Sequence, residues 1–226
     1  MDMRIALNDS FAYAKESVWG QWKRWIILTI MSIIFPFILG YMMEIYRGIT
    51  PPPEPENWGQ LFVDGLKFLL VAIIYAIPVI IILVASFFPV MLSIFSKIGA
   101  GGEFTMDLSG LAPFFLPVFG GLLLAFIMGV AITLISTIGI VRMARVGGIG
   151  EAFNFSAIFE TIRAIGWVSY IFALIVLGVV VIVVSFIFSL AEVIPYLGFI
   201  ITLFLGVILT VFEARFLTLL YESSEY

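Results

Sequence analysis

The ionisable residues that could do chemistry are few, and those of most interest stand beside long apolar runs. Four residues hold such positions: Glu44, Glu192, Glu213 and Arg215. An ionisable group held inside a bilayer is a candidate functional group, because burying it is costly. Long side chains near the end of an apolar run can also reach water, so interfacial anchoring or ion pairing explains these positions as well.

Ion pairing is the simplest role for the charges close to these runs. Asp64 and Lys67 are three residues apart on an expected helix, so their side chains can pair. Glu213 is expected to pair with Arg142 or Arg145. The candidate ion-pair residues are Asp64, Lys67, Glu44, Arg47, Arg142, Arg145, Glu213 and Arg215.

Several kinds of chemistry are excluded by composition. The 226 residues contain no Cys and no His, which removes Cys nucleophiles, thiolate and imidazole metal ligands and the imidazole proton shuttle. The glycines at 147–150 lack the Lys and the strand–helix setting of a phosphate-binding loop. The dispersed Lys and Arg residues make no patch suited to nucleic acid. We therefore predict no catalytic, cofactor-binding or metal-ligating residue and no nucleic-acid partner.

The elements that position these charges are those of a membrane protein. Hydrophobic residues make up 63% of the chain and charged residues 12%, against about 25% charged in soluble domains. The apolar runs are continuous over roughly 20–30 residues, which argues against a transmembrane β-barrel. We expect an all-α polytopic helical membrane bundle that forms a single integral membrane domain over residues 1–226.

The apolar runs and the amphipathic stretches between them define the expected elements. Four full transmembrane helices are predicted at residues 68–96, 113–141, 166–190 and 197–220. Residues 25–43 form another membrane segment, which Pro36 interrupts, so it is either a re-entrant hairpin or a fifth crossing. Interfacial helices are expected at residues 4–18, 57–67 and 151–165. Residues 97–111 are expected to form a short polar turn.

Each interfacial helix has a predicted orientation, and in residues 151–165 the apolar side is expected to hold Phe155, Phe159 and Ile162. In residues 4–18 the apolar face consists of Leu7, Phe11, Ala14 and Val18. This pattern predicts a helix lying on the membrane surface, and a partner-docking arm is the alternative. In residues 57–67, Trp58, Leu61, Phe62 and Leu66 share one face, while Gln60, Asp64 and Lys67 lie on the other.

The distribution of Lys and Arg distinguishes the two interpretations of residues 25–43. If this segment re-enters, every basic residue of the eleven except Lys97 lies on the cytoplasmic side. If it crosses fully, the basic residues divide almost evenly between the two sides. Cytoplasmic enrichment of Lys and Arg favours the first arrangement. We therefore predict a multi-pass protein of the cell membrane with both termini in the cytoplasm.

Two of the expected spans carry ladders of small residues at four-residue spacing. The first is Gly121, Ala125, Gly129, Thr133 and Thr137, and the second is Gly198, Thr202, Gly206, Thr210 and Ala214. Such ladders let helix backbones approach closely, so a packed seam is one interpretation, and Gly129→Leu or Gly206→Leu would then destabilise the fold. The other interpretation is that the Thr side chains line a polar path.

Several blocks of the chain resemble those of a known family. They are Gly40-Tyr41, the block Trp58-x-x-x-x-x-Asp64-Gly65-x-Lys67, the span with Tyr75 and Pro78, and Glu151-Ala152-Phe153. The chain is similar here to an uncharacterised "domain of unknown function" family of archaeal and bacterial multi-pass membrane proteins. The resemblance implies a membrane protein of unassigned activity and supplies no catalytic residue.

Two functions fit these features best. The first is a non-enzymatic membrane component that organises an assembly or binds lipid, with membrane lipid, a second copy of the chain or another membrane protein as partner. The alternative is a small channel or transporter subunit, since transporters often combine broken helices with internal repeats. An intramembrane enzyme fits least well, because the chain offers no nucleophile–base pair.

Overall fold

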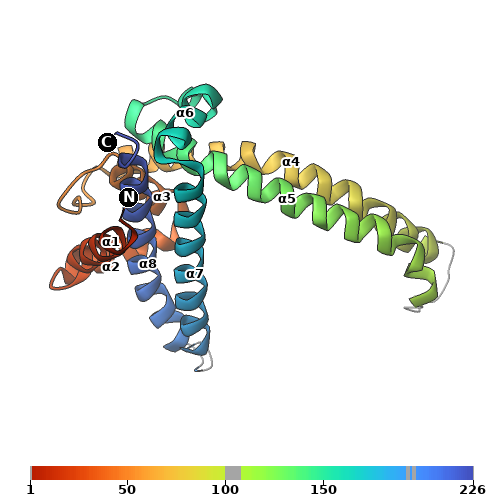
Figure 1. Ribbon diagram of the computed structural model, residues 1–226. Coiled ribbons are helices and arrows are strands. Elements are labelled where there is room, and N and C mark those ends of the chain that lie inside the picture. The colour runs from red at the N-terminus through yellow and green to blue at the C-terminus, as the bar shows by residue number, and fades with distance from the viewer. Residues whose placement is uncertain (1, 100–107, 192–193, 195–196, 226) are drawn as a thin grey trace. The chain divides into compact units, whose positions relative to one another are not determined.

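The computed structural model describes residues 2–99, 108–191, 194 and 197–225, and it is helical and without strands over these residues (Figure 1). The α-helices are α1 (Met3–Val18), α2 (Trp22–Ile33), α3 (Phe35–Tyr46), α4 (Trp58–Gly99), α5 (Leu108–Val146), α6 (Phe155–Ile165), α7 (Trp167–Ala191) and α8 (Leu197–Glu222). A short 3-10 helix, η1 (Ile149–Phe153), precedes α6. The polar turn expected at residues 97–111 lies largely outside the described residues.

Four stretches of helix are long and apolar enough to cross a membrane. They are Trp58–Ser96, Pro113–Val146, Trp167–Ala191 and Leu197–Glu222. Each exceeds the roughly 20 apolar residues that a bilayer core requires. The predicted all-α fold is confirmed, with four helices that are long and apolar enough for full crossings.

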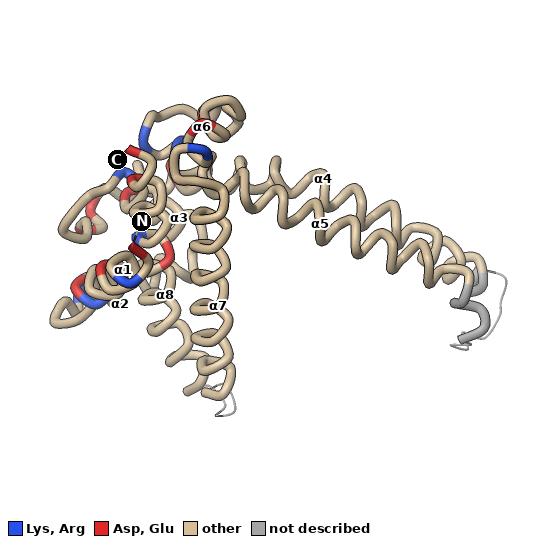
Figure 2. The backbone as a smooth tube through the Cα atoms, in the orientation of Figure 1, with Lys and Arg blue, Asp and Glu red and all other residues tan. Residues whose placement is uncertain are grey.

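The chain forms two compact units. Unit 1 comprises Met1–Val71 and Ile135–Tyr226, and unit 2 comprises Ala72–Leu134. In unit 1 the charged residues gather around α1, α2, α6 and one end of α8 (Figure 2). In unit 2 the stretches 72–96 and 113–134 carry no charged residue.

Residues 22–46 of unit 1 form two short helices instead of one span. α2 ends at Ile33 and α3 begins at Phe35, because Ile34 has a non-helical backbone (φ −97°, ψ 82°). Pro36 lies in the first turn of α3, where its missing N–H costs no intrahelical bond. Each helix has 12 residues and is about 18 Å long, shorter than the ~30 Å hydrocarbon core. The predicted interruption near Pro36 is confirmed.

α3 and the first part of α4 cross with their backbones in contact. A Cβ atom added at Gly40 would lie 1.9 Å from the carbonyl oxygen of Leu61, and one added at Gly65 would lie 1.7 Å from that of Pro36. Real Cβ atoms do not approach other atoms so closely, so both positions require glycine. Close crossings of membrane helices generally depend on small residues in this way.

The predicted interfacial helix at residues 57–67 is the first part of α4, which continues into the span. Trp58 and Phe62 are exposed, as expected of aromatic rings at a membrane interface. Leu61 and Asp64 are buried, at 1% and 3% exposure. The predicted outward face for Asp64 is therefore wrong, because the close crossing with α3 covers that side of the helix.

α1 packs on α8 through a face of mostly small residues. Its buried residues are Ala6, Ser10, Tyr13, Ala14, Ser17 and Val18. The predicted apolar face is wrong in part, because Phe11 is 62% exposed. Small side chains let the two helices approach closely, which leaves Phe11 facing outward. The helix thus docks on its own chain, whereas the sequence predicted a surface helix or an arm for a partner.

The third interfacial stretch, residues 151–165, is divided between η1 and α6. Asn154 ends η1 and caps α6, and its side-chain oxygen accepts a hydrogen bond of 3.3 Å from the N–H of Ala157. Ile158 and Ile162 are fully buried and give α6 its apolar side, whereas Phe155, predicted on that side, is 48% exposed. Gly166, with φ 89°, then turns the chain into α7.

In unit 2, α4 and α5 lie side by side (Figure 1). Their close contact is between Gly121 and Ser86: a Cβ added at Gly121 would lie 1.7 Å from the Ser86 Oγ. Tyr75 and Ala125 are the buried hydrophobic residues among those described in this unit. Most of its large apolar side chains are exposed, which suits helices surrounded by lipid, since acyl chains are as apolar as Leu.

Candidate functional site

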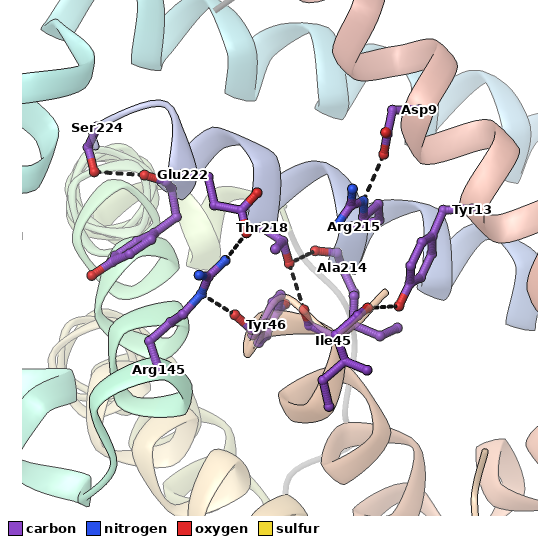
Figure 3. A network of polar contacts seen from close by, with 12 residues as sticks. Asp9, Tyr13, Ile45, Tyr46, Arg145, Ala214, Arg215, Thr218, Glu222 and Ser224 are labelled. Carbon is purple, nitrogen blue, oxygen red and sulfur yellow. Dashed lines mark hydrogen bonds and ion pairs between the residues drawn. The ribbon is translucent and has the colours of Figure 1, made fainter. Parts of the chain in front are cut away.

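Several polar contacts of unit 1 converge on the C-terminal end of α3, at the carbonyl groups of Ile45 and Tyr46 (Figure 3), and on the carbonyl group of Ile49 just beyond it. We call this set the α3 junction. The last carbonyls of a helix lack partners within the helix and carry its partial negative charge. Buried carbonyls need donors, since an unpaired polar group is costly away from water. The donors here come from α1, α5 and α8.

Arg145, in the last turn of α5, supplies the positive charge of the junction. Its Nε donates to the carbonyl oxygen of Tyr46 at 2.6 Å, and its Nη2 pairs with the carboxylate of Glu222. Its guanidinium lies 5.6 Å from the ring centroid of Tyr221. A cation at a helix C-terminus is stabilised by the helix dipole. One side chain therefore connects α5, α3 and α8.

Two hydroxyl groups supply the neutral donors. The Thr218 hydroxyl is fully buried and lies 3.1 Å from the carbonyl oxygen of Ile45 and 2.8 Å from that of Ala214 in its own helix. The Tyr13 hydroxyl donates to the carbonyl oxygen of Ile49 at 2.8 Å. Burial raises the pKa of Tyr13, although nearby Arg215 opposes this, so the phenol keeps its proton and stays a donor at neutral pH.

Arg215 joins α1 to α8 beside the junction. Its Nε donates to the Asp9 carboxylate at 2.7 Å, and its guanidinium lies 5.0 Å from the ring centroid of Tyr13. Arg215 is 8% exposed, and a buried guanidinium needs both a carboxylate and a favourable surface for its faces. Arg215 thus holds α1 and α8 together.

A second polar cluster lies at the crossing of α3 and α4. The Asp64 carboxylate accepts hydrogen bonds from Arg47 and, at 2.8 Å, from Lys67. Glu44 is 9% exposed, and its Oε2 has no hydrogen-bond partner within the described part of the chain. Burial raises the pKa of Glu44, while Arg47 opposes the shift. Four of the candidate ion-pair residues are thus brought to one place.

Two further ion pairs connect neighbouring segments. Arg24 of α2 pairs with Glu54, in the loop that follows α3. This hydrogen bond raises the pKa of Arg24 and holds the pKa of Glu54 below its usual range. Arg142 of α5 donates to Glu151 of η1 at 2.8 Å. The first pair fixes the loop between α3 and α4 to the start of α2, and the second fixes η1 to the end of α5.

The expected pairing of Glu213 with Arg142 or Arg145 does not occur. Arg142 is bound to Glu151 and Arg145 to Glu222, and Glu213 forms no ion pair with any residue that the structure describes. The physical reason is proximity, because η1 directly follows the end of α5 and the last turn of α8 carries Glu222.

The residues of the first small-residue ladder, from Gly121 to Thr137, differ in how closely other parts of the chain pack against them. Gly121 and Ala125 lie on the side of α5 that contacts α4 within unit 2. A Cβ added at Gly129 would meet no atom within 4 Å. The Thr133 hydroxyl donates to the Gly129 carbonyl of its own helix at 2.9 Å, and Thr137 is half-buried.

The second ladder is buried at its ends and open in its middle. Gly198 and Ala214 are buried, whereas a Cβ added at Gly206 would meet no atom within 4 Å. Thr210 donates to the Gly206 carbonyl at 3.0 Å, and Thr202 is half-buried. The described atoms of the chain therefore leave room at Gly129 and Gly206, and the predicted destabilisation by leucine at these two positions is not supported.

The α3 junction was not predicted, and the sequence holds little that could have revealed it. Thr218 is 173 residues from its acceptor Ile45, and Asp9 is 206 residues from Arg215. Spacing within one helix cannot indicate contacts of this range. The one usable signal was the break at Pro36, since a short helix inside a membrane protein must leave its last carbonyls to be satisfied by other elements.

The junction and the cluster at Asp64 can hold helices at fixed positions. In the residues that the structure describes, no group of three His, Cys, Asp or Glu side chains could hold a metal ion. The cations of the junction are instead bound to carboxylates and carbonyls from other segments.

Comparison with known proteins identifies a family. No curated protein and no solved structure matches the chain. The model of one family, described as "Protein of unknown function (DUF4013)", matches residues 25–193, a stretch that begins inside α2 and extends beyond the end of α7. The match covers well over half of the 226 residues. The chain is therefore a member of the DUF4013 family of proteins of unknown function.

Proposed function

We propose that the protein is a non-enzymatic structural component of a membrane, which assembles with itself or with another membrane protein and holds lipid. The observation that supports this most strongly is the α3 junction. Its polar side chains and the neighbouring Asp9–Arg215 pair connect segments up to 206 residues apart. Side chains used in this way stabilise one arrangement of helices, which is what a scaffold requires.

The proposed orientation places both termini in the cytoplasm and residues 25–43 in a re-entrant hairpin. The ion pair between Arg24 and Glu54 supports it, because it joins the start of α2 to the loop after α3. The distribution of Lys and Arg supports the same topology. Glu54→Cys and Glu103→Cys variants should react with an impermeant thiol reagent on opposite sides of the membrane. Reaction from the same side would contradict the hairpin.

The open middle of the first ladder is the proposed surface for assembly. Gly129 is half-buried, and nothing lies within 4 Å of the position that its Cβ would occupy. Small residues at such an open place allow a helix of a second protein to approach closely. In the cell membrane the second protein is either another copy of the chain or a different membrane protein.

Substitution at Gly129 separates assembly from folding. Gly129→Leu should leave the unfolding free energy within about 0.5 kcal/mol of the parent, because the site is open. It should also lower the fraction of oligomer measured by native mass spectrometry or by cross-linking in lipid. Ile127→Ala, on an exposed position of the same helix, is the matched control and should leave the oligomer unchanged. A monomer at every concentration, with no co-purifying membrane protein, would overturn the proposal.

A channel or transporter subunit is the second candidate, and the broken pair α2–α3 is the observation that favours it. Discontinuous helices commonly line transporter binding sites. The hydroxyls of Thr133 and Thr210, however, donate to carbonyls of their own helices, which suits a structural role better than a polar path. Liposomes containing the purified protein should therefore be no leakier than protein-free liposomes. A saturable flux that Thr133→Val or Thr210→Val lowers would favour the channel.

A further inference from the structure

A pocket of about 710 Å³ lies in unit 1 between the start of α2 and the loop that leads into α4. Gln21, Lys23 and Arg24 line it on the α2 side, and Glu54, Glu56 and Trp58 line it on the loop side. Pockets that bind small molecules in proteins fall in the same range, roughly 300–1,000 Å³. The residue types around this pocket indicate what it would bind.

The α2 side of the pocket is suited to an anion. α2 begins at Trp22, and its N-cap residue Gln21 makes no side-chain capping bond, so that side chain leaves the partial positive charge of the helix N-terminus uncompensated. Lys23 is exposed and adds a positive charge. Arg24 is nine-tenths buried, its Nη2 binds Glu54, and its Nε is shielded from solvent without a hydrogen-bond partner among the described residues. The positive charge on this side of the pocket suits a phosphate group.

The loop side of the pocket is suited to a cation. Glu54 and Glu56 are exposed, and the two carboxylates balance the charges of Lys23 and Arg24. A ligand with negative charge alone would face these carboxylates at close range. A ligand that carries a phosphate and an ammonium group, and so has no net charge, can satisfy both sides of the pocket.

The surroundings place this ligand at a membrane interface. Trp58 lies at the pocket, and Trp22 is 66% exposed beside it. Exposed Trp side chains favour the headgroup region of a bilayer. Ile27 adds an apolar wall next to the charged residues. Such a combination of charged, aromatic and aliphatic surface suits the region where a headgroup joins its acyl chains.

We infer that this pocket binds the headgroup of a zwitterionic phospholipid, with the phosphodiester at the N-terminus of α2, Lys23 and Arg24, and the ammonium group at Glu54 and Glu56. The inference rests on the proposed role of the protein as a membrane component that holds lipid, and it names the chemical class of that lipid.

Binding of lipid to the delipidated full-length protein in detergent tests the inference by native mass spectrometry. Phosphatidylethanolamine carries both charges and should bind more tightly than phosphatidylglycerol, which lacks the ammonium group. Lys23→Gln should weaken phosphatidylethanolamine binding roughly ten-fold, the effect of losing one charged contact. Inorganic phosphate and glycerophosphoethanolamine, added separately, show whether the site needs only phosphate, only the headgroup or the whole lipid.

Charge reversal gives a result that loss of folding cannot imitate. Glu56→Lys should reverse the preference, so that phosphatidylglycerol binds more tightly than phosphatidylethanolamine. Glu160→Lys, at an exposed position of α6, is the matched control and should leave the preference unchanged. Equal binding of the two lipids, or no response to Glu56→Lys, would overturn the inference. An oligomer that persists in that case would leave the proposed scaffold role standing, so the two failures can be told apart.

Discussion

In unit 1 the end of a single helix receives hydrogen bonds from three other helices, whereas in unit 2 the close contact is that of Gly121 with Ser86. Most of the buried hydrophobic residues belong to unit 1, and those described in unit 2 are Tyr75 and Ala125. Composition contributes to this difference, because the stretches 72–96 and 113–134 of unit 2 carry no charged residue, whereas unit 1 holds most of the charged residues of the chain.

The two units differ in polar contacts because they differ in how many helix ends and loops they contain. Unit 1 contains helix ends and loops, whose unpaired carbonyl groups attract cationic and hydroxyl side chains. The described stretches 72–96 and 113–134 of unit 2 are helical, so their backbone groups are largely satisfied within each helix. Specific polar contacts are therefore needed in unit 1, while packing and lipid suffice for unit 2.

The largest loss of stability is expected in unit 1, at the close crossing of α3 and α4. Gly65→Ala places a Cβ atom on the backbone carbonyl of Pro36, so the two helices must separate. The expected loss of unfolding free energy is about 3 kcal/mol or more, the upper end for overpacking. Gly59→Ala, earlier in α4, adds a Cβ that meets nothing within 4 Å and should cost nothing. Denaturant titration in bicelles measures both, and equal stabilities would show that the crossing is not tight.

A smaller effect is expected in unit 2 at Gly121. Its close neighbour is the side chain of Ser86, which can be removed, whereas the neighbour of Gly65 is backbone. Gly121→Ala should lower the unfolding free energy by about 1–3 kcal/mol. Adding Ser86→Gly should restore most of the loss, because it removes the overlapping atoms. Failure of this rescue would mean that other parts of α4 and α5 determine their approach.

The polar part of the comparison is tested at Thr218. Thr218→Val keeps the shape but removes a buried hydroxyl that lies between the carbonyl oxygens of Ile45 and Ala214, and it should cost about 1–2 kcal/mol. Thr210→Val is the matched control, because Thr210 donates only to the Gly206 carbonyl of its own helix among the contacts that the structure gives, and it should cost less than about 0.5 kcal/mol. If both variants lost the same stability, the α3 junction would have no special role.

The smallest expected effect concerns pH. Arg24 holds the pKa of Glu54 below its ordinary value, so the ionised form is favoured in the folded protein. The resulting stability is present above the unfolded pKa of about 4.3 and is lost as the pH falls through the lower folded pKa. Because Glu54 is half-exposed, the contribution is about 0.2–1 kcal/mol.

The pH dependence can be isolated by a single substitution. Thermal unfolding of the parent and of Glu54→Gln should differ most above pH 5 and converge toward pH 3. A difference that grows as the pH falls would contradict the sign of the shift. Glu160→Gln, at an exposed carboxylate on α6 for which no ion pair is found in the described part of the chain, serves as the control.

Much of the architecture could be predicted from the sequence, because the signals for it are local. Continuous apolar runs indicated the four crossings, and Pro36 indicated the break between α2 and α3. The orientations of α1 and of the first part of α4 were predicted less well. Hydrophobic patterning identifies the apolar face, but here close packing placed the small or polar face of each helix against the protein, as Ser10 and Asp64 show.

The contacts of the candidate site could not be predicted. The ladders at Gly129 and Gly206 were visible as patterns, yet spacing alone cannot tell whether a neighbour fills the face that they form. The carboxylates that pair with Arg215 and Arg145 could not be predicted either. In the sequence Asp9 and Glu222 resemble ordinary surface charges, and only the fold brings them next to these arginines.

The hydrogen bond from Thr218 to Ile45 has a consequence for synthesis at the ribosome. The two residues are 173 positions apart, and chain elongation at roughly 5–20 residues per second makes Thr218 about 10–35 seconds later than its acceptor. During that interval the Ile45 carbonyl of the nascent α3 has its local bond from the N–H of Gly48, at 2.8 Å, but lacks its second donor. Synthesis of the C-terminal helix then supplies that donor and completes unit 1.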